Sequence, residues 1–328
     1  MQLPLRYRGL AAATLLSAAA ASCSPTQAAP PPANQPSQVS GEHTAAAVSG
    51  DPVIAAAGDI ACDASSGAYN GGRGTADRCR QRAVSDLLVG TGVDAVLPLG
   101  DNQYERGSLE DFRRSYDASW GRVLSRTHPV PGNHEYGVSG ASGYFSYFGA
   151  RAGAPSRGYY SYNVGAWHLI ALNSECGHIG GCGTGSAQER WLKADLAANR
   201  RACTLAYWHR PRFSSGAHGS DASYRVFWND LYAAGADVVL AGHDHDYERF
   251  APQTPAGVAD PGTGIREFVV GTGGAEHYPV VNVVPNSELR NGDTFGVLRL
   301  TLHPGSYDWD FMPEAGQTFT DSGSSTCH

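Results

Sequence analysis

The strongest constraint on the fold is a pattern that recurs along the chain from residue 51. A short apolar run is followed at once by a polar loop that contains Asp, Asn or His. Near-continuous apolar runs of about four to eight residues are typical of strands that are covered on both faces. We therefore expect strands over 53–58, 95–100, 127–132, 166–174, 203–209, 237–242, 266–274 and 295–302.

Helical patterns lie between several of these runs, over 76–91, 108–120, 187–199 and 221–234. The alternation of strands and helices predicts an α/β fold. From residue 266 onward the sequence shows strand patterns and no helical one, so part of the sheet should be antiparallel. We interpret the aromatic segment 144–162 as a hairpin packed against the sheet. No change in composition between 51 and 328 marks a second domain.

The first residues of the chain have the features of an export signal. Arg6 and Arg8 precede an apolar run over 9–22, which ends at Cys23. This run is too short to cross a bilayer, which takes ~20 residues, and a secretory signal has this arrangement. The A-A-S-C ending also resembles a bacterial lipobox, although Ala20 stands where Leu is usual. Simple secretion and a lipid anchor on Cys23 both remain open.

Pro, Ala, Ser and Gln dominate residues 24–50, which contain almost no bulky apolar side chain. Such a segment cannot offset the entropy lost on ordering. We therefore expect a signal peptide over 1–23, a disordered linker over 24–50 and one folded domain over 51–328. The formal net charge of −7 implies no basic face, so nucleic acid is not an expected partner.

The cysteine count is seven, which is odd. If Cys23 belongs to the processing signal, six remain, and an exported chain reaches an oxidising compartment where disulfides form. Six cysteines allow fifteen pairings. Proximity favours Cys62–Cys79 and Cys176–Cys182, which leaves Cys203–Cys327. A zinc site is the alternative, but the sequence contains no C-x-x-C pair.

Five of the polar loops carry metal-ligand residue types. They are Gly58-Asp59, the segment Gly100-Asp101-Asn102-Gln103-Tyr104, the segment Gly132-Asn133-His134-Glu135, His209, and Gly242-His243-Asp244-His245. Ligands of open α/β sheets bind at the carboxyl ends of strands, so these loops should converge on one edge. Glycine at most of these turns allows a close approach of the backbone.

Carboxylate, amide, phenolate and imidazole groups suit Fe, Mn and Zn, and none of them is a thiolate. Seven such residues are enough for two metal ions that share one carboxylate. Two ions ~3.5–4 Å apart can clamp a phosphoryl group and activate water near neutral pH. Each loop alone is a common feature, whereas the ordered set of five is not.

This ordered set resembles the metallophosphoesterase (calcineurin-like) superfamily over roughly 52–275, and within it the purple acid phosphatase branch. Most of the superfamily has D-x-H at the first motif, but here Ala61 stands where that His would be. Tyr104, three residues after Asp101, completes the G-D-x-x-Y form in which a tyrosinate replaces the missing His. The resemblance implies a mixed-sheet β-sandwich flanked by helices, in a single-domain form, with the metal site at the C-terminal ends of the strands.

The resemblance also implies the roles of the seven ligand-type residues. Asp101 would bridge two metal ions. One ion, Fe(III), would be bound by Asp59, Tyr104 and His245. The other, a divalent Fe, Zn or Mn, would be bound by Asn133, His209 and His243.

Two further histidines receive catalytic roles from the resemblance. His134 would hydrogen-bond the phosphate and act as general acid toward the leaving group, a role that imidazole can fill. His218 would contact the substrate, unless it is a solvent-exposed loop residue. Glu135 and Asp244 would orient ligand imidazoles, or would simply be exposed. His277 follows G-T-G-G and could approach the site.

The expected function is that of a secreted binuclear metallohydrolase of the acid phosphatase type. It would cleave small phosphate monoesters through attack by a metal-bound hydroxide. The alternative is a phosphodiesterase of the same superfamily. A third hypothesis is an inactive surface lipoprotein that binds a ligand or partner. The presence of every expected metal-ligand residue argues against it. The chain would be exported and either secreted or lipid-anchored at a bacterial surface.

Overall fold

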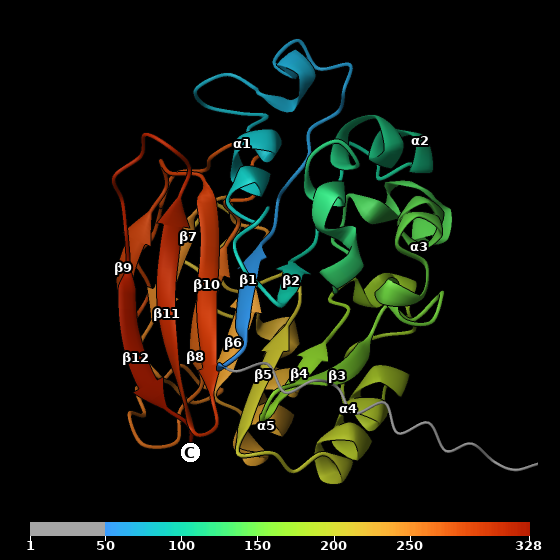
Figure 1. Cartoon of the computed structure of the whole chain (residues 1–328). Helices are drawn as coiled ribbons and strands as arrows, with labels where there is room; N and C mark the ends of the chain where they lie inside the picture. Colours follow the sequence, from blue (N-terminus) through green and yellow to red (C-terminus); the bar gives the residue numbers. More distant parts are fainter. Residues whose placement is uncertain (1–49) are drawn as a thin grey trace, which may run out of the picture. The chain divides into compact units, whose positions relative to one another are not determined.

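The computed structural model describes residues 50–328. The predicted signal over 1–23, with Cys23, lies outside the described residues, and so does the linker apart from Gly50. In the described part, two mixed β-sheets pack face to face (Figure 1). This arrangement confirms the predicted α/β sandwich.

The smaller sheet has the strand order β12-β11-β10-β1-β2. Its strands are β1 (Val53–Ala57), β2 (Ala95–Pro98), β10 (Gly296–His303), β11 (Ser306–Pro313) and β12 (Ser322–Thr326). Strand β1 is parallel to β2, and the other pairs are antiparallel.

The larger sheet has the order β3-β4-β5-β6-β8-β7-β9. Its central strands β4, β5, β6 and β8 are parallel, and the pairs toward either edge are antiparallel. The strands are β3 (Tyr160–Val164), β4 (Trp167–Ala171), β5 (Cys203–Tyr207), β6 (Val238–Ala241), β7 (Tyr247–Phe250), β8 (Arg266–Val270) and β9 (Ser287–Asn291).

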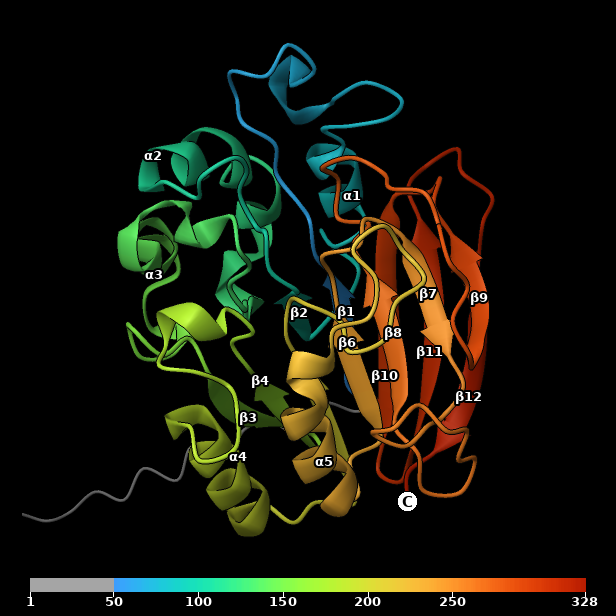
Figure 2. The same cartoon turned by 180° about the vertical axis from the view of Figure 1, so that it is seen from behind.

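Apolar side chains on both faces of the larger sheet explain why its strands are continuous apolar runs. In β5, Leu205 and Tyr207 join the core between the two sheets, whereas Ala206 joins a second core on the outer face. The helices α4 (Ala187–Ala198) and α5 (Arg225–Ala233) cover that outer face (Figure 2). Successive residues of a strand point to opposite faces of the sheet. A strand that is buried on both faces is therefore apolar throughout, as the sequence pattern predicts.

Of three shorter helices, α2 and α3 lie beyond the β2 edge of the smaller sheet, and α1 lies above the end of β1 (Figures 1 and 2). They are α1 (Gln81–Asp86), α2 (Leu109–Asp111), which continues into a π-helical turn, and α3 (Ser142–Phe148). The predicted helix over 76–91 is therefore shorter than expected. The hairpin prediction for 144–162 is wrong in its first half, because α3 contains Tyr144 to Phe148, and only β3 pairs as a hairpin strand with β4.

The predicted strand over 127–132 is also wrong. This segment runs beside β2 but makes only two isolated bridges, Val96 with Thr127 and Leu99 with Val130. Proline lacks the backbone N–H that a ladder requires, and two of the six residues are proline. The segment still brings the following loop to the end of β2.

The three predicted disulfides, Cys62–Cys79, Cys176–Cys182 and Cys203–Cys327, are present. The third ties the start of β5 to the C-terminus across 124 residues of sequence. Among residues 50–328, no helix has both the length and the apolar character that a membrane span requires.

His128 should make the fold sensitive to acid. Its ring stacks on Tyr162 at 4.0 Å, and burial, with a contribution from the charge of Arg151, lowers its pKa to about 4. The same group titrates near ~6.5 in an unfolded chain. Protonation therefore favours the unfolded state, and stability should be lost as the pH falls from about 6.5 to about 4.

We expect His128→Gln to unfold with a smaller difference in free energy between pH 7 and pH 4.5 than the parent, measured by urea denaturation. The matched control, His178→Gln, replaces an exposed histidine and should keep the parent's difference. An unchanged difference in His128→Gln would contradict the assignment.

Candidate metal centre

Left-handed backbone turns aim the candidate ligands into the space at the strand ends. Asp59, Asp101 and His243 each follow a glycine at the end of β1, β2 or β6, and each has a positive φ, of 61°, 45° and 73° respectively. A non-glycine residue in this region costs of order 1–3 kcal/mol, and such residues cluster at functional sites. The backbone thus turns sharply after the last strand residue at three of the predicted loops.

Two of the glycines allow contacts that no larger residue would permit. A Cβ on Gly100 would lie 2.6 Å from the ring of His209, and a Cβ on Gly132 would lie 2.3 Å from Oδ1 of Asp101. Real Cβ atoms do not approach other atoms this closely. The loop after β2 therefore packs directly against His209 at Gly100, and the loop that begins at Gly132 packs directly against Asp101.

The first group of candidate ligands surrounds the Tyr104 hydroxyl. This oxygen lies 3.0 Å from Oδ1 of Asp59, 3.0 Å from Nε2 of His245 and 3.4 Å from Oδ2 of Asp101. His245 Nε2 is itself 3.3 Å from Asp59 Oδ1. All four side chains are buried.

The second group surrounds Nε2 of His209. This nitrogen lies 3.1 Å from Oδ2 of Asp101, 3.2 Å from Oδ1 of Asn133 and 3.2 Å from Nδ1 of His243. Asp101, His209 and His243 can each place one ligand atom within 4.8 Å of the others. The seven predicted residues are thus brought together as two groups, and Asp101 belongs to both.

Backbone carbonyls fix which ring nitrogens face these groups. Nδ1 of His209 donates to the carbonyl of Leu99 at 2.9 Å, and Nδ1 of His245 donates to the carbonyl of Glu276 at 2.9 Å. A carbonyl only accepts, so the ring proton resides on Nδ1 and the lone pair of Nε2 points into the group. This second contact is the one that metal-binding histidines usually make.

The convergence of lone pairs requires a positive charge. His209 Nε2, Asp101 Oδ2 and Asn133 Oδ1 would repel one another unless a proton or a cation lies between them. Burial opposes protonation of His209, but the charge of Asp101 outweighs it and raises the pKa of His209 to about 10. Burial, with the charges of Asp59 and Asp101, also raises the pKa of Tyr104 well above its ordinary value. These residues fit metal ions that would displace the protons.

Glu135 joins two of the loops instead of orienting an imidazole, so both sequence-based readings of it are wrong. It is fully buried, and its carboxylate accepts hydrogen bonds from the amides of Asn102 (2.9 Å), Gln103 (3.1 Å) and Gly132 (2.7 Å). Burial, with the nearby charge of Asp101, raises the pKa of Glu135 to about 8.

Asp244 is also buried, and it orients His218 and not a candidate ligand. Its Oδ1 accepts from the amide of His218 at 2.7 Å and lies 3.1 Å from Nδ1 of the same residue. The ring of His218 lies 4.1 Å from that of His243. His218 is therefore fixed beside the second group, although its side chain is 42% exposed.

His134 lies at the edge of the site. Its amide donates to Asp101 Oδ1 at 2.8 Å, its Nδ1 bonds the carbonyl of Glu105 at 2.7 Å, and its Nε2 lies 3.9 Å from Asp101 Oδ2. With Tyr104 and Tyr278 it lines a cavity of about 120 Å³. The ring of His277 stacks on Phe295 with ring centroids 3.7 Å apart.

Two residues at the site were missed by the sequence analysis. Tyr278 stacks on His245 with ring centroids 3.9 Å apart. Arg210 donates from its guanidinium to Asn133 Oδ1 at 3.1 Å and contacts Nε2 of His243 at 3.0 Å. The position of Arg210 directly after His209 was the available signal for that residue. The G-T-G-G segment pointed to His277, whereas its neighbour Tyr278 is the residue that contacts a candidate ligand.

Residues 52–247 match the calcineurin-like phosphoesterase family, and this match covers more than half of the chain and includes all seven candidate ligands. The chain therefore belongs to the calcineurin-like phosphoesterase family.

Among curated relatives, purple acid phosphatase 15 of Arabidopsis thaliana is 34% identical over 199 residues, which cover 49% of this chain and 37% of that protein. Acid phosphatase type 7 of Danio rerio is 30% identical over 205 residues, which cover 52% of this chain and 44% of that protein. The alignments thus span less than half the length of either relative.

Among solved structures, a purple acid phosphatase from yellow lupin (Lupinus luteus) seeds superposes with a TM-score of 0.61 at 19% identity, over 84% of this chain and 53% of that one. A dimetal phosphatase from Danio rerio gives a TM-score of 0.54 at 14% identity, over 85% of this chain and 100% of that one. At these identities the likeness establishes the fold.

Gly132→Ala should reduce metal binding, because its Cβ would displace the carboxylate of Asp101 that both groups share. Gly177→Ala is the matched control, since its Cβ would meet no atom within 4 Å. We expect elemental analysis to show substoichiometric metal in the first variant and the parent's content in the second. Full metal content in a folded Gly132→Ala protein would show that Asp101 is not needed in its present position.

Proposed function

We propose that the chain is an exported phosphomonoesterase that uses two metal ions and acts on small phosphorylated substrates. The observation that carries this proposal is the pair of donor groups that share the carboxylate of Asp101. Family membership and the named acid phosphatases among the relatives support the same class of reaction.

In this proposal the two donor groups hold different metals. Asp59, Tyr104 and His245 bind Fe(III), because a phenolate prefers the harder and more acidic ion. Asn133, His209 and His243 bind a divalent Fe, Zn or Mn. When bound, the two ions supply Lewis-acid polarisation of the phosphoryl group and activation of water.

The proton for the leaving group is assigned to His134. The carbonyl of Glu105 holds the Nδ1 proton, so the imidazolium form presents its other proton on Nε2, at the edge of the cavity next to Tyr104. From there it can be transferred to the leaving alkoxide. His218, held by Asp244, contacts the phosphoryl group beside His243.

The three disulfides support export to an oxidising compartment. In this proposal the predicted signal over 1–23 directs the export. Lipidation of Cys23 would anchor the protein to a membrane, and cleavage without lipidation would release it.

Hydrolysis should require the metal ions and the second donor group. We expect the purified protein to cleave p-nitrophenyl phosphate faster than bis-p-nitrophenyl phosphate, and to lose turnover on treatment with a chelator. Asn133→Ala and His209→Ala should lower kcat/KM at least ~100-fold, in line with the loss of a group that stabilises the transition state, while circular dichroism shows an intact fold. Faster cleavage of the diester would assign a phosphodiesterase instead, and full activity of both variants would exclude the proposed centre.

Tyr104 should give the metal-loaded protein a visible colour. A phenolate bound to Fe(III) produces a charge-transfer band, which Tyr104→Phe should abolish in the absorption spectrum. A colourless parent with two Zn or Mn ions and full activity would contradict the iron assignment and leave the hydrolase proposal standing.

A further inference from the structure

Arg210 places a permanent positive charge against the second donor group. Its guanidinium donates to Asn133 Oδ1 at 3.1 Å and contacts His243 Nε2 at 3.0 Å. The side chain is half-buried, and its exposed fraction is 30%. Because arginine stays protonated at any physiological pH, this charge persists whatever the state of the neighbouring histidines.

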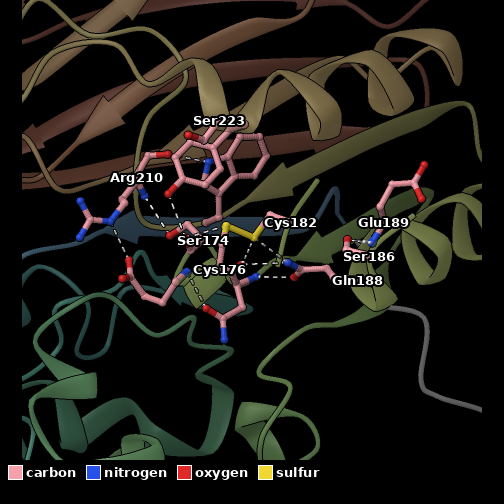
Figure 3. Close-up of a disulfide and its surroundings, with 12 residues drawn as sticks. Ser174, Cys176, Cys182, Ser186, Gln188, Glu189, Arg210 and Ser223 are labelled. Carbon is pink, nitrogen blue, oxygen red and sulfur yellow. Dashed lines mark hydrogen bonds and ion pairs between the residues drawn. A yellow bond between two sulfur atoms is a disulfide. The ribbon is translucent and has the colours of Figure 1, made fainter. Parts of the chain in front are cut away.

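A braced loop holds Arg210 in this position. Its Nε donates to the carboxylate of the buried Glu175 at 2.8 Å, and its amide donates to Ser174 Oγ at 3.2 Å. The Cys176–Cys182 disulfide closes the loop that follows these two residues (Figure 3). Glu175 and Ser174 therefore hold Arg210 in position without the help of a ligand.

Arg210 keeps donors available for a ligand. Guanidinium has five N–H groups, and the contacts with Glu175, Asn133 and His243 use three of them. Arg210 also lines a cavity of about 140 Å³ together with His218 and His243. A planar cation with two remaining donors suits the tetrahedral oxygens of a phosphoryl group.

The one carboxylate that lines the same cavity, in the part of the chain that the structure describes, belongs to Asp221. Its Oδ1 accepts from the amide of Ser223 at 2.8 Å and so caps the short helical turn that follows. Asp221 thus has a structural partner of its own, and Arg210 and His218 supply the groups that face an anion.

We propose that Arg210 binds the non-bridging oxygens of the substrate phosphoryl group and thereby favours dianionic monoesters over monoanionic diesters. Glu175 is a positioning residue that aims the guanidinium. The preference for monoesters rests on the proposed function, whereas the binding of inorganic phosphate by Arg210 does not require turnover. The two ideas can therefore fail separately.

The test measures phosphate binding and metal content together. Arg210→Gln and Arg210→Lys are compared with the parent by isothermal titration of the metal-loaded protein with inorganic phosphate. A hydrogen bond to a charged group contributes about 1.5–3 kcal/mol, so Arg210→Gln should weaken phosphate binding about 10- to 100-fold. Arg210→Lys keeps the charge but not the fork of donors, so its affinity for phosphate should lie between that of the parent and that of Arg210→Gln. Metal content, by elemental analysis, should stay at the parent's value in both.

Arg200→Gln is the matched control, because it removes an exposed arginine from the groove between α4 and α5. Arg200→Gln should bind phosphate as the parent does.

In Arg210→Gln the ratio of kcat/KM for p-nitrophenyl phosphate to kcat/KM for bis-p-nitrophenyl phosphate should fall as well. Unchanged phosphate affinity in Arg210→Gln would overturn the proposal. Loss of a metal ion together with phosphate binding would also overturn it, because Arg210 would then only hold Asn133 and His243 in place.

Discussion

The turn glycines Gly100, Gly132 and Gly242 lie so close to the side chains of neighbouring loops that none of them has room for a Cβ. The rest of the site depends on this packing. Glycines at the turns let one loop lie directly on the side chains of the next, and the left-handed residues that follow them aim inward. A sandwich with wider turns at these ends would keep its core but would not bring two carboxylates, three imidazoles and a phenol into contact.

Such a cluster is electrostatically unbalanced without a cation. Burial of a carboxylate is expensive unless a charge or a hydrogen-bond donor compensates it. At this site protons on His209 and Tyr104 provide the compensation, as the raised pKa values of both groups indicate. When a metal ion replaces the proton, the Nε2 lone pairs of His209 and His245 would face it, because backbone carbonyls hold the Nδ1 protons of both rings. The backbone therefore fixes the orientation of these two imidazoles.

The sequence predicted the strands with continuous apolar runs, because alternate residues of those strands enter two different cores. It failed at 127–132, where the apolar pattern is that of a strand but prolines prevent a ladder, and at 144–148, where aromatic content gives no period. The seven candidate ligands were predictable because they lie in polar loops that follow apolar runs, and because the ordered set of loops resembles a known family. Tyr278 was not predictable, since it reaches His245 from a loop that is distant in sequence. Arg210 directly follows a predicted ligand, but its contact with Asn133 joins loops that are distant in sequence.

The central claim is that two metal ions lie on either side of the Asp101 carboxylate. Anomalous diffraction from crystals of the purified protein, recorded on both sides of the iron and zinc absorption edges, tests it most directly. The account predicts two peaks, an iron peak among Asp59, Tyr104 and His245 and a second metal among Asn133, His209 and His243. A single peak, or none at either group in crystals grown with both metals, would contradict it.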